Sequence, residues 1–98
     1  MDFEFKNSNM ENVYYDPSAS LGHGPVVDRG FRKVIGKIDA AYTELDLRNL
    51  KSLHYHKLEG KRSYQHALNI TNQWRLIVER IELNGRIKLL IISVEDYH

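Results

Sequence analysis

Apolar residues dominate positions 87–94, near the end of the chain. An extended chain would carry them on both of its sides: Ile87, Leu89 and Ile91 on one, and Leu90, Ile92 and Val94 on the other. A strand that is apolar on both sides needs cover on both sides or a neighbouring strand along each edge. The pattern therefore predicts a central strand in this segment.

Three earlier stretches alternate apolar and polar residues with the two-residue period of a strand. They are residues 2–6, 64–71 and 74–81. Asn84 and Gly85 lie between the strand predicted at 74–81 and the one predicted at 87–94. This pair is typical of a tight hairpin turn because both residues tolerate positive φ. We therefore expect the last three strands to pair as an antiparallel sheet.

Between positions 27 and 45, apolar residues recur at steps of three and four, as on a helix with one side facing a core. Pro25 or Asp28 is expected to begin this helix. Gly30 and Gly36 lie in its interior, where each costs about 1 kcal/mol relative to alanine. Close packing at these two positions is the expected reason for them.

Two shorter helices are expected beside the long one. One lies within residues 7–15, and the other follows Thr43, which can cap its first turn. The fold class is therefore α+β, with an N-terminal strand and helices packed on an antiparallel sheet. The chain has 98 residues and no repeat or linker, so residues 1–98 are predicted to form a single compact domain.

Composition narrows the class of protein. The hydrophobic share of 42% and the charged share of 28% are those of an ordinary soluble globular protein. The sequence contains neither an apolar run long enough to cross a bilayer nor the pattern of a signal peptide. It has no cysteine, which excludes disulfides, thiolate catalysis and cysteine zinc sites. A cytoplasmic protein without a membrane partner is expected.

Positive charge is concentrated in one stretch, although the formal net charge is only +1. Residues 48–62 hold five cations and two histidines against a single acid, Glu59. The cations and histidines are Arg48, Lys51, His54, His56, Lys57, Lys61 and Arg62. This pattern is expected where one face of a protein meets phosphate.

The predicted topology brings this stretch and the end of the chain to the same group of strands. The residues expected to share one concave face are His56, Lys57, Lys61, Arg62, Arg75, Asp96, Tyr97 and His98. Such a set can cleave RNA without a cofactor. One group takes the proton of the 2′-hydroxyl, another protonates the leaving 5′-oxygen, and cations stabilise the phosphorane. Imidazole suits either proton transfer, and guanidinium groups suit the phosphate.

Each of these residues also has a simpler interpretation. His54 and His56 would share one side of a strand, but no third ligand stands at a fixed spacing, so no metal site is predicted. Trp74 is better explained as a core anchor than as a base-stacking platform. Arg75 could form a surface ion pair with Glu79, and the basic stretch could be a solvated loop.

Three motifs follow one another in the second half of the chain: residues 56–62 (HKLEGKR), 70–76 (ITNQWRL) and 95–98 (EDYH). In this order they resemble the motifs of the HigB-type (plasmid maintenance killer) toxins, a branch of the RelE-like superfamily in bacterial type II toxin–antitoxin pairs. The resemblance is specific from about Arg48 to His98, and residues 38–41 fit the family more loosely. It implies the compact RelE-like fold.

The resemblance also implies a function, that of a ribosome-dependent endoribonuclease (mRNA interferase). Such toxins cut mRNA in the ribosomal A site and inhibit translation. The implied partners are the ribosome, mRNA and a cognate helix-turn-helix antitoxin of the HigA type, with operator DNA bound only through the antitoxin complex. Matched by position, the family's catalytic residues are His56, Asp96, Tyr97 and His98, and its phosphate-binding and basic residues are Arg75, Lys61 and Arg62.

One position departs from the family pattern, because many relatives have a lysine where this chain has Glu59. A carboxylate facing the scissile phosphate would oppose anion binding, so either Glu59 points away or the neighbouring lysines compensate. Two other hypotheses follow. A toxin of the same fold could act by binding a target such as DNA gyrase, and a non-catalytic chain could serve as a co-repressor. The terminal Asp96, Tyr97 and His98 count against a pure binder.

Overall fold

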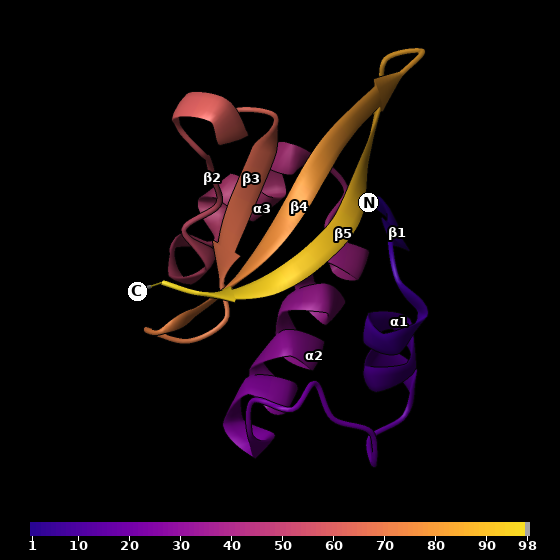
Figure 1. Cartoon of the computed structure of the whole chain (residues 1–98). Coiled ribbons are helices and arrows are strands. Elements are labelled where there is room, and N and C mark those ends of the chain that lie inside the picture. The colour runs from indigo at the N-terminus through magenta and orange to yellow at the C-terminus, as the bar shows by residue number, and fades with distance from the viewer. Residues whose placement is uncertain (98) are drawn as a thin grey trace.

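The computed structural model describes residues 1–97, which form a five-stranded sheet with helices on one side (Figure 1). The elements are β1 (Asp2–Phe5), α1 (Ser8–Tyr15), α2 (Pro25–Ala40), α3 (Glu44–Asn49), β2 (His56–Lys57), β3 (Gln65–Asn69), β4 (Trp74–Leu83) and β5 (Arg86–Asp96). Short 3-10 turns cover Lys51–Leu53 and Gly60–Arg62. The α+β class predicted from the sequence is confirmed.

The strand order is β1-β5-β4-β3-β2, with β1 parallel to β5 and the other pairs antiparallel. Strand β5 therefore has a neighbour along each edge, as its apolar sequence predicts. The turn at Asn84 and Gly85 joins β4 to β5 with both residues at positive φ, which confirms the predicted hairpin. The edge strand β2 was not predicted, because two residues are too short to show an alternating pattern.

The long helix α2 begins at Pro25, directly after Gly24, whose φ is +96°. Proline fits the first helical position because the amide hydrogen that it lacks would have no partner within the helix. The short helix predicted after Thr43 is present: α2 ends at Ala40, and Thr43 and Asp46 form a capping box at the start of α3. Among the described residues, no helix has the length and apolar character needed to span a membrane.

The main core lies between the helices and one face of the sheet. Phe31, Ile35 and Ile38 of α2 are fully buried there, against strand residues that include Leu76 and Leu89. We call the opposite face, which carries no helix, the open face. It holds a smaller apolar cluster, formed by Leu58, Ala67 and Ile77 together with the partly buried Ile92.

A bulge in β5 decides which side chains reach the open face. Ile77 pairs with Ser93 and the next residue, Val78, pairs with Ile91, so β5 has one extra residue at this point. Side chains beyond a bulge point to the opposite face from the one that regular alternation gives. Val94 accordingly packs against the main core rather than sharing a face with Ile92, so the alternation predicted for it is wrong.

Candidate functional site

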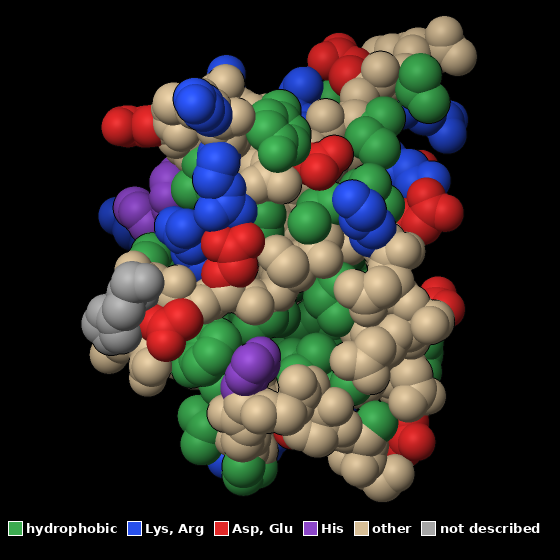
Figure 2. Space-filling view, viewed as in Figure 1, with side chains coloured by type: hydrophobic (Ala, Val, Ile, Leu, Met, Phe, Trp, Pro, Cys, Tyr) green, Lys and Arg blue, Asp and Glu red, His purple; other side chains and the backbone are tan. Residues whose placement is uncertain are grey.

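The bulge turns Glu95 and Tyr97 toward the open face, where they meet Arg75 of β4 and Arg62 of the Gly60–Arg62 turn. We call these four residues the arginine cluster. In Figure 2, Lys and Arg side chains gather over β2 and β3, with His side chains at the outer edge and an acidic side chain beside them. The described residues thus place positive charge beside the end of β5.

Glu95 is the centre of the arginine cluster. Its two carboxylate oxygens accept separate hydrogen bonds from Arg62, at 2.9 Å from Nη1 and 2.7 Å from Nη2. Ser93 Oγ donates a third bond of 3.2 Å, and Arg75 Nη2 lies 3.7 Å from Oε1. The hydrogen bonds from Arg62 lower the pKa of Glu95 below its ordinary value, so Glu95 is an anion at neutral pH.

Arg62 is held from a second direction as well. Its Nε donates to Gln65 Oε1 at 3.0 Å, and Gln65 lies at the start of β3. The turn that carries Arg62 begins at Gly60, whose φ of +66° suits glycine. The bonds to Glu95 raise the pKa of Arg62 further above neutrality. The guanidinium is therefore fixed in position, charged, and directed at the open face.

Arg75 lies beneath the ring of Tyr97, with its Cζ atom 5.0 Å from the ring centre. Only 19% of the Arg75 side chain is exposed, and its Nε is buried with no hydrogen-bond partner among the described residues. Tyr97 is held by two further contacts: its hydroxyl donates to Asn69 Oδ1, and its backbone N–H donates to Gln73 O at 2.7 Å. The ring is thereby fixed over the arginine.

His56 lies on β2 opposite Ala67, which belongs to the apolar cluster of the open face. Its Nδ1 is 2.7 Å from the carbonyl oxygen of His54. A carbonyl oxygen only accepts hydrogen bonds, so this contact requires the proton on Nδ1 and leaves Nε2 of a neutral ring as a proton acceptor. The His54 and His56 rings lie 4.4 Å apart, but no three His, Asp or Glu side chains within residues 1–97 are grouped to hold a metal ion.

Two of the eight residues expected on one face lie elsewhere, so that expectation is wrong for them. Asp96 alternates with Glu95 and Tyr97, pairs with Trp74, and accepts a 3.0 Å bond from Gln73 Nε2. Lys57 pairs with His66 and lines a different pocket. Lys61 is exposed in the turn beside Arg62, and Glu59 is exposed just before that turn. The predicted catalytic residue His98 lies outside the described residues.

The pocket that Lys57 lines has a volume of about 410 Å³ and lies beside β2 and α3. Its other lining residues are Glu44, Arg48, Ser63, Tyr64, His66 and Arg80. Burial opposes ionisation of Glu44, but hydrogen bonds of 2.7 Å from Arg80 and 2.8 Å from the Tyr55 hydroxyl lower its pKa overall. We call this the Glu44 pocket. The negative charge of Glu44 is already paired with Arg80.

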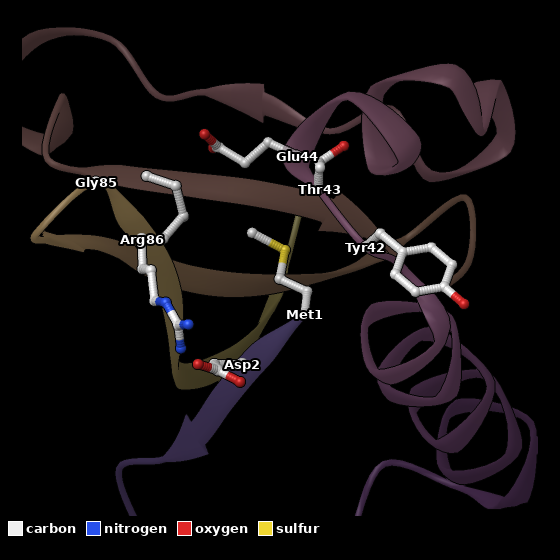
Figure 3. Close-up of a pocket in the computed structure, with 8 residues that line it drawn as sticks. Met1, Asp2, Tyr42, Thr43, Glu44, Gly85 and Arg86 are labelled. Carbon is white, nitrogen blue, oxygen red and sulfur yellow. The ribbon is translucent and has the colours of Figure 1, made fainter.

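A third feature is a hollow of about 390 Å³ at the far end of the β4–β5 hairpin (Figure 3). Asp2 and Arg86 lie on one side of it and Tyr42, Thr43 and Glu44 on the other. Its lining contains none of the site residues predicted from the sequence. The candidate chemistry therefore lies at the arginine cluster, on the open face.

Sequence reasoning missed Glu95, although it belongs to the quoted EDYH motif. Regular alternation would turn it toward the helices, and the bulge is what brings it to the open face. Gln65, Asn69 and Ser93 were missed for another reason. Each is a polar residue on a strand, and only the fold shows that it contacts Arg62, Tyr97 or Glu95.

No protein-family model and no curated protein sequence matches this chain. Among solved structures, the chain is similar to a YoeB/ParE toxin from Agrobacterium tumefaciens, with a TM-score of 0.58. The similarity covers 100% of both chains at 10% sequence identity. At that identity the likeness establishes a shared fold: this chain folds along its whole length like a YoeB/ParE toxin.

Proposed function

We propose that this protein is the toxin of a type II toxin–antitoxin system, and that it cleaves mRNA in the ribosomal A site by metal-independent acid–base chemistry. The observation that carries the proposal is the convergence of Arg62 and Arg75 on one carboxylate of the open face, beside Tyr97. Two guanidinium groups at one point are suited to a phosphate. The fold shared with a YoeB/ParE toxin supports the toxin assignment.

The open face supplies the parts of such a reaction. Arg75 and Arg62 would bind the scissile phosphate and stabilise the charge of the phosphorane, with Lys61 adding positive charge nearby. His56 offers Nε2 as the acceptor of the 2′-hydroxyl proton. His98 follows Tyr97 in the sequence and is proposed as the partner that protonates the leaving oxygen. The exposed part of the Tyr97 ring would stack on a base of the mRNA.

The proposal includes the partners that the HigB-type resemblance implies. A helix-turn-helix antitoxin of the HigA type would neutralise the toxin, and the complex of the two would bind operator DNA. The ribosome would present the mRNA codon, which places the protein in the cytoplasm. Lys61, which is exposed beside Arg62 in the same turn, suits contact with RNA.

The direct test is cleavage of a defined mRNA on programmed ribosomes, mapped by primer extension, with the same mRNA free of ribosomes in parallel. Wild type is expected to cut only with ribosomes, and Arg75→Ala is expected to abolish the cuts. Arg29→Ala is the matched control, because Arg29 is exposed on α2, away from the open face. Equal cleavage by Arg75→Ala and wild type would show that the proposed site is wrong.

A second candidate is a toxin or co-repressor of the same fold that acts by binding a protein. One observation favours it: Glu95 neutralises part of the positive charge that an RNA phosphate would need. This candidate predicts no cuts with or without ribosomes. Growth arrest together with inhibited DNA supercoiling would then indicate a gyrase-type target, and tight antitoxin binding without growth arrest would indicate a co-repressor.

A further inference from the structure

The guanidinium group of Arg62 already has an anionic ligand. Nη1 and Nη2 bind the two oxygens of Glu95 in a fork, and Nε binds Gln65. A phosphate presents a similar pair of acceptor oxygens to the same fork. One fork cannot hold both anions in this bidentate geometry, so a phosphate and the Glu95 carboxylate compete for the same donors.

The surroundings hold Glu95 in this competing position. The bulge directs its side chain to the open face, and Ser93 Oγ donates to the same oxygen that Arg62 Nη2 binds. Arg75 Nη2 lies on the other oxygen, at 3.7 Å. The carboxylate therefore sits between the two arginines, where an oxyanion would be stabilised by both.

Glu95 can also leave this position. Its side chain is 31% exposed and that of Arg62 is 39% exposed, so the pair opens to solvent without unpacking the core. An exposed ion pair of this kind is weak enough for an incoming ligand to break. A proton acceptor in catalysis would need a pKa near neutrality, whereas Arg62 lowers the pKa of Glu95.

We propose that Glu95 is an internal ligand of the arginine pair, held where a phosphate group of the substrate binds, and that the phosphate displaces it from Arg62. The identity of that phosphate as part of an mRNA rests on the proposed function. The competition for the two arginines does not rest on the proposed function, because any oxyanion meets the same hydrogen-bond donors. Glu95 thereby sets the affinity of the free protein for phosphate and weakens its binding to RNA in general.

The test measures binding of inorganic phosphate, and of a short RNA made uncleavable by 2′-O-methylation, to the whole chain by calorimetry and by NMR of the arginine Nε–H groups. Glu95→Gln keeps the shape of the side chain and removes its charge. We expect it to bind both probes about three- to ten-fold more tightly than wild type, the range for a partly exposed bidentate pair.

The matched control is Glu82→Gln, which removes the same charge and also breaks a glutamate–arginine contact, that of Glu82 with Arg80 at 3.1 Å. It lies near the hairpin end of β4, away from the arginine cluster. Its phosphate affinity is expected to stay within about two-fold of wild type, because distant exposed charges are screened. An equal gain of phosphate affinity in both variants would show that the gain comes from the change in net charge alone, and it would overturn the proposal.

Two further variants separate an internal ligand from a residue that orients Arg62. In an Arg62→Ala background, the gain from Glu95→Gln is expected to shrink to about two-fold or less, because only the 3.7 Å contact of Glu95 with Arg75 remains; an undiminished gain would overturn the proposal. Ser93→Ala leaves every charge in place and frees Glu95 from one bond, so about a two-fold gain is expected. Weaker phosphate binding by Glu95→Gln would mean that Glu95 orients the arginines, and the proposal would be wrong.

The ribosome assay keeps this inference apart from the proposed function. Tighter phosphate binding by Glu95→Gln without any cleavage on ribosomes would support the internal ligand and reject the mRNA-cleaving toxin. Cleavage on ribosomes with no gain in phosphate affinity would reject the internal ligand and leave the toxin proposal standing.

Discussion

The ring of Tyr97 covers the guanidinium of Arg75, with 5.0 Å between the Arg75 Cζ atom and the ring centre. The Tyr97 hydroxyl is bound to Asn69 at the same time. The ring thus orients the arginine from above while a neighbouring strand holds the ring. In this arrangement the aromatic face does more for the site than the hydroxyl, because the hydroxyl already donates its proton to Asn69.

We therefore predict different results for two substitutions of Tyr97. Tyr97→Phe keeps the ring over Arg75 and is expected to retain ribosome-dependent cleavage within about five-fold, the loss of roughly one hydrogen bond. Tyr97→Ala is expected to lose about ten-fold or more, because both the cation–π contact and base stacking disappear. Single-turnover cleavage on programmed ribosomes measures both. An equally large loss in Tyr97→Phe would assign the hydroxyl a direct part in proton transfer.

Asp96 gives a second test of the site. The bulge places it on the side of Trp74, where Gln73 Nε2 donates to it. Asp96→Asn is therefore expected to keep cleavage within about three-fold of wild type, while Arg75→Ala abolishes it, since an amide replaces the carboxylate at the cost of about one hydrogen bond. Parallel primer extension on ribosomes compares the two variants. A complete loss in Asp96→Asn would mean that the end of β5 rearranges on the ribosome.

The sequence patterns predict the sheet better than they predict the site, for a physical reason. Apolar periodicity reflects burial, so it identifies β5 as central and α2 as amphipathic. The direction of the side chains beyond Ser93 depends on a single extra residue in β5, and neither glycine nor proline marks the bulge in the sequence. Because of that extra residue, Glu95 points to the open face and Asp96, which was predicted there, points to the other side. The two-residue strand β2 similarly sends Lys57 away from His56.

The two glycines inside α2 predict opposite effects of the same substitution. A Cβ atom on Gly30 would lie 2.8 Å from Ile70 Cγ2 and 3.2 Å from the Ile70 carbonyl oxygen, whereas none of the atoms around Gly36 lies within 4 Å of its added Cβ. Close packing thus accounts for Gly30 and not for Gly36. Gly36→Ala is expected to raise the free energy of unfolding by about 1 kcal/mol through helix propensity. Gly30→Ala is expected to lower it by about 1–3 kcal/mol through overpacking.

Urea unfolding of the two variants measures this difference, and each is the other's control because both change glycine to alanine within one helix. A stabilised Gly30→Ala would mean that Ile70 moves aside at little cost. A destabilised Gly36→Ala would contradict the open surroundings of that position.

Protonation of Glu44 is expected to account for part of the loss of folding stability at acid pH. Its pKa lies below the ordinary value of 4.5 because the bonds from Arg80 and Tyr55 outweigh burial. A carboxyl group whose pKa is lower in the folded state stabilises the protein above its unfolded pKa and loses that effect as the pH falls through the folded pKa. We expect Glu44→Gln to cost about 1–2 kcal/mol at pH 7 and less below pH 4. Thermal unfolding from pH 7 to pH 3 tests this, and an unchanged pH dependence would contradict it.

Replacing His66 is expected to stabilise the protein. Its ring stacks on Tyr55 with 5.0 Å between the ring centres, and it is 5% exposed. Its Nδ1 is buried without a hydrogen-bond partner among the described residues, which costs about 1–3 kcal/mol for a typical polar group. Burial also lowers the pKa of His66 below its ordinary value of 6.5, so the ring is neutral in the folded protein at neutral pH. Phenylalanine keeps the stacked ring and removes the unpaired nitrogen.

His66→Phe is therefore expected to raise the free energy of unfolding at pH 7 by about 1 kcal/mol. The gain should grow as the pH falls below 6.5, because the unfolded histidine binds a proton that the folded one resists, and phenylalanine binds none. Urea unfolding at pH 7 and pH 5.5 measures both effects, and phosphate binding should be unchanged because His66 lies on the helix-covered side of β3, away from the arginine cluster. A loss of stability at pH 7 would mean that an ordered water binds Nδ1, and the Glu44 pocket would then be a hydrated site.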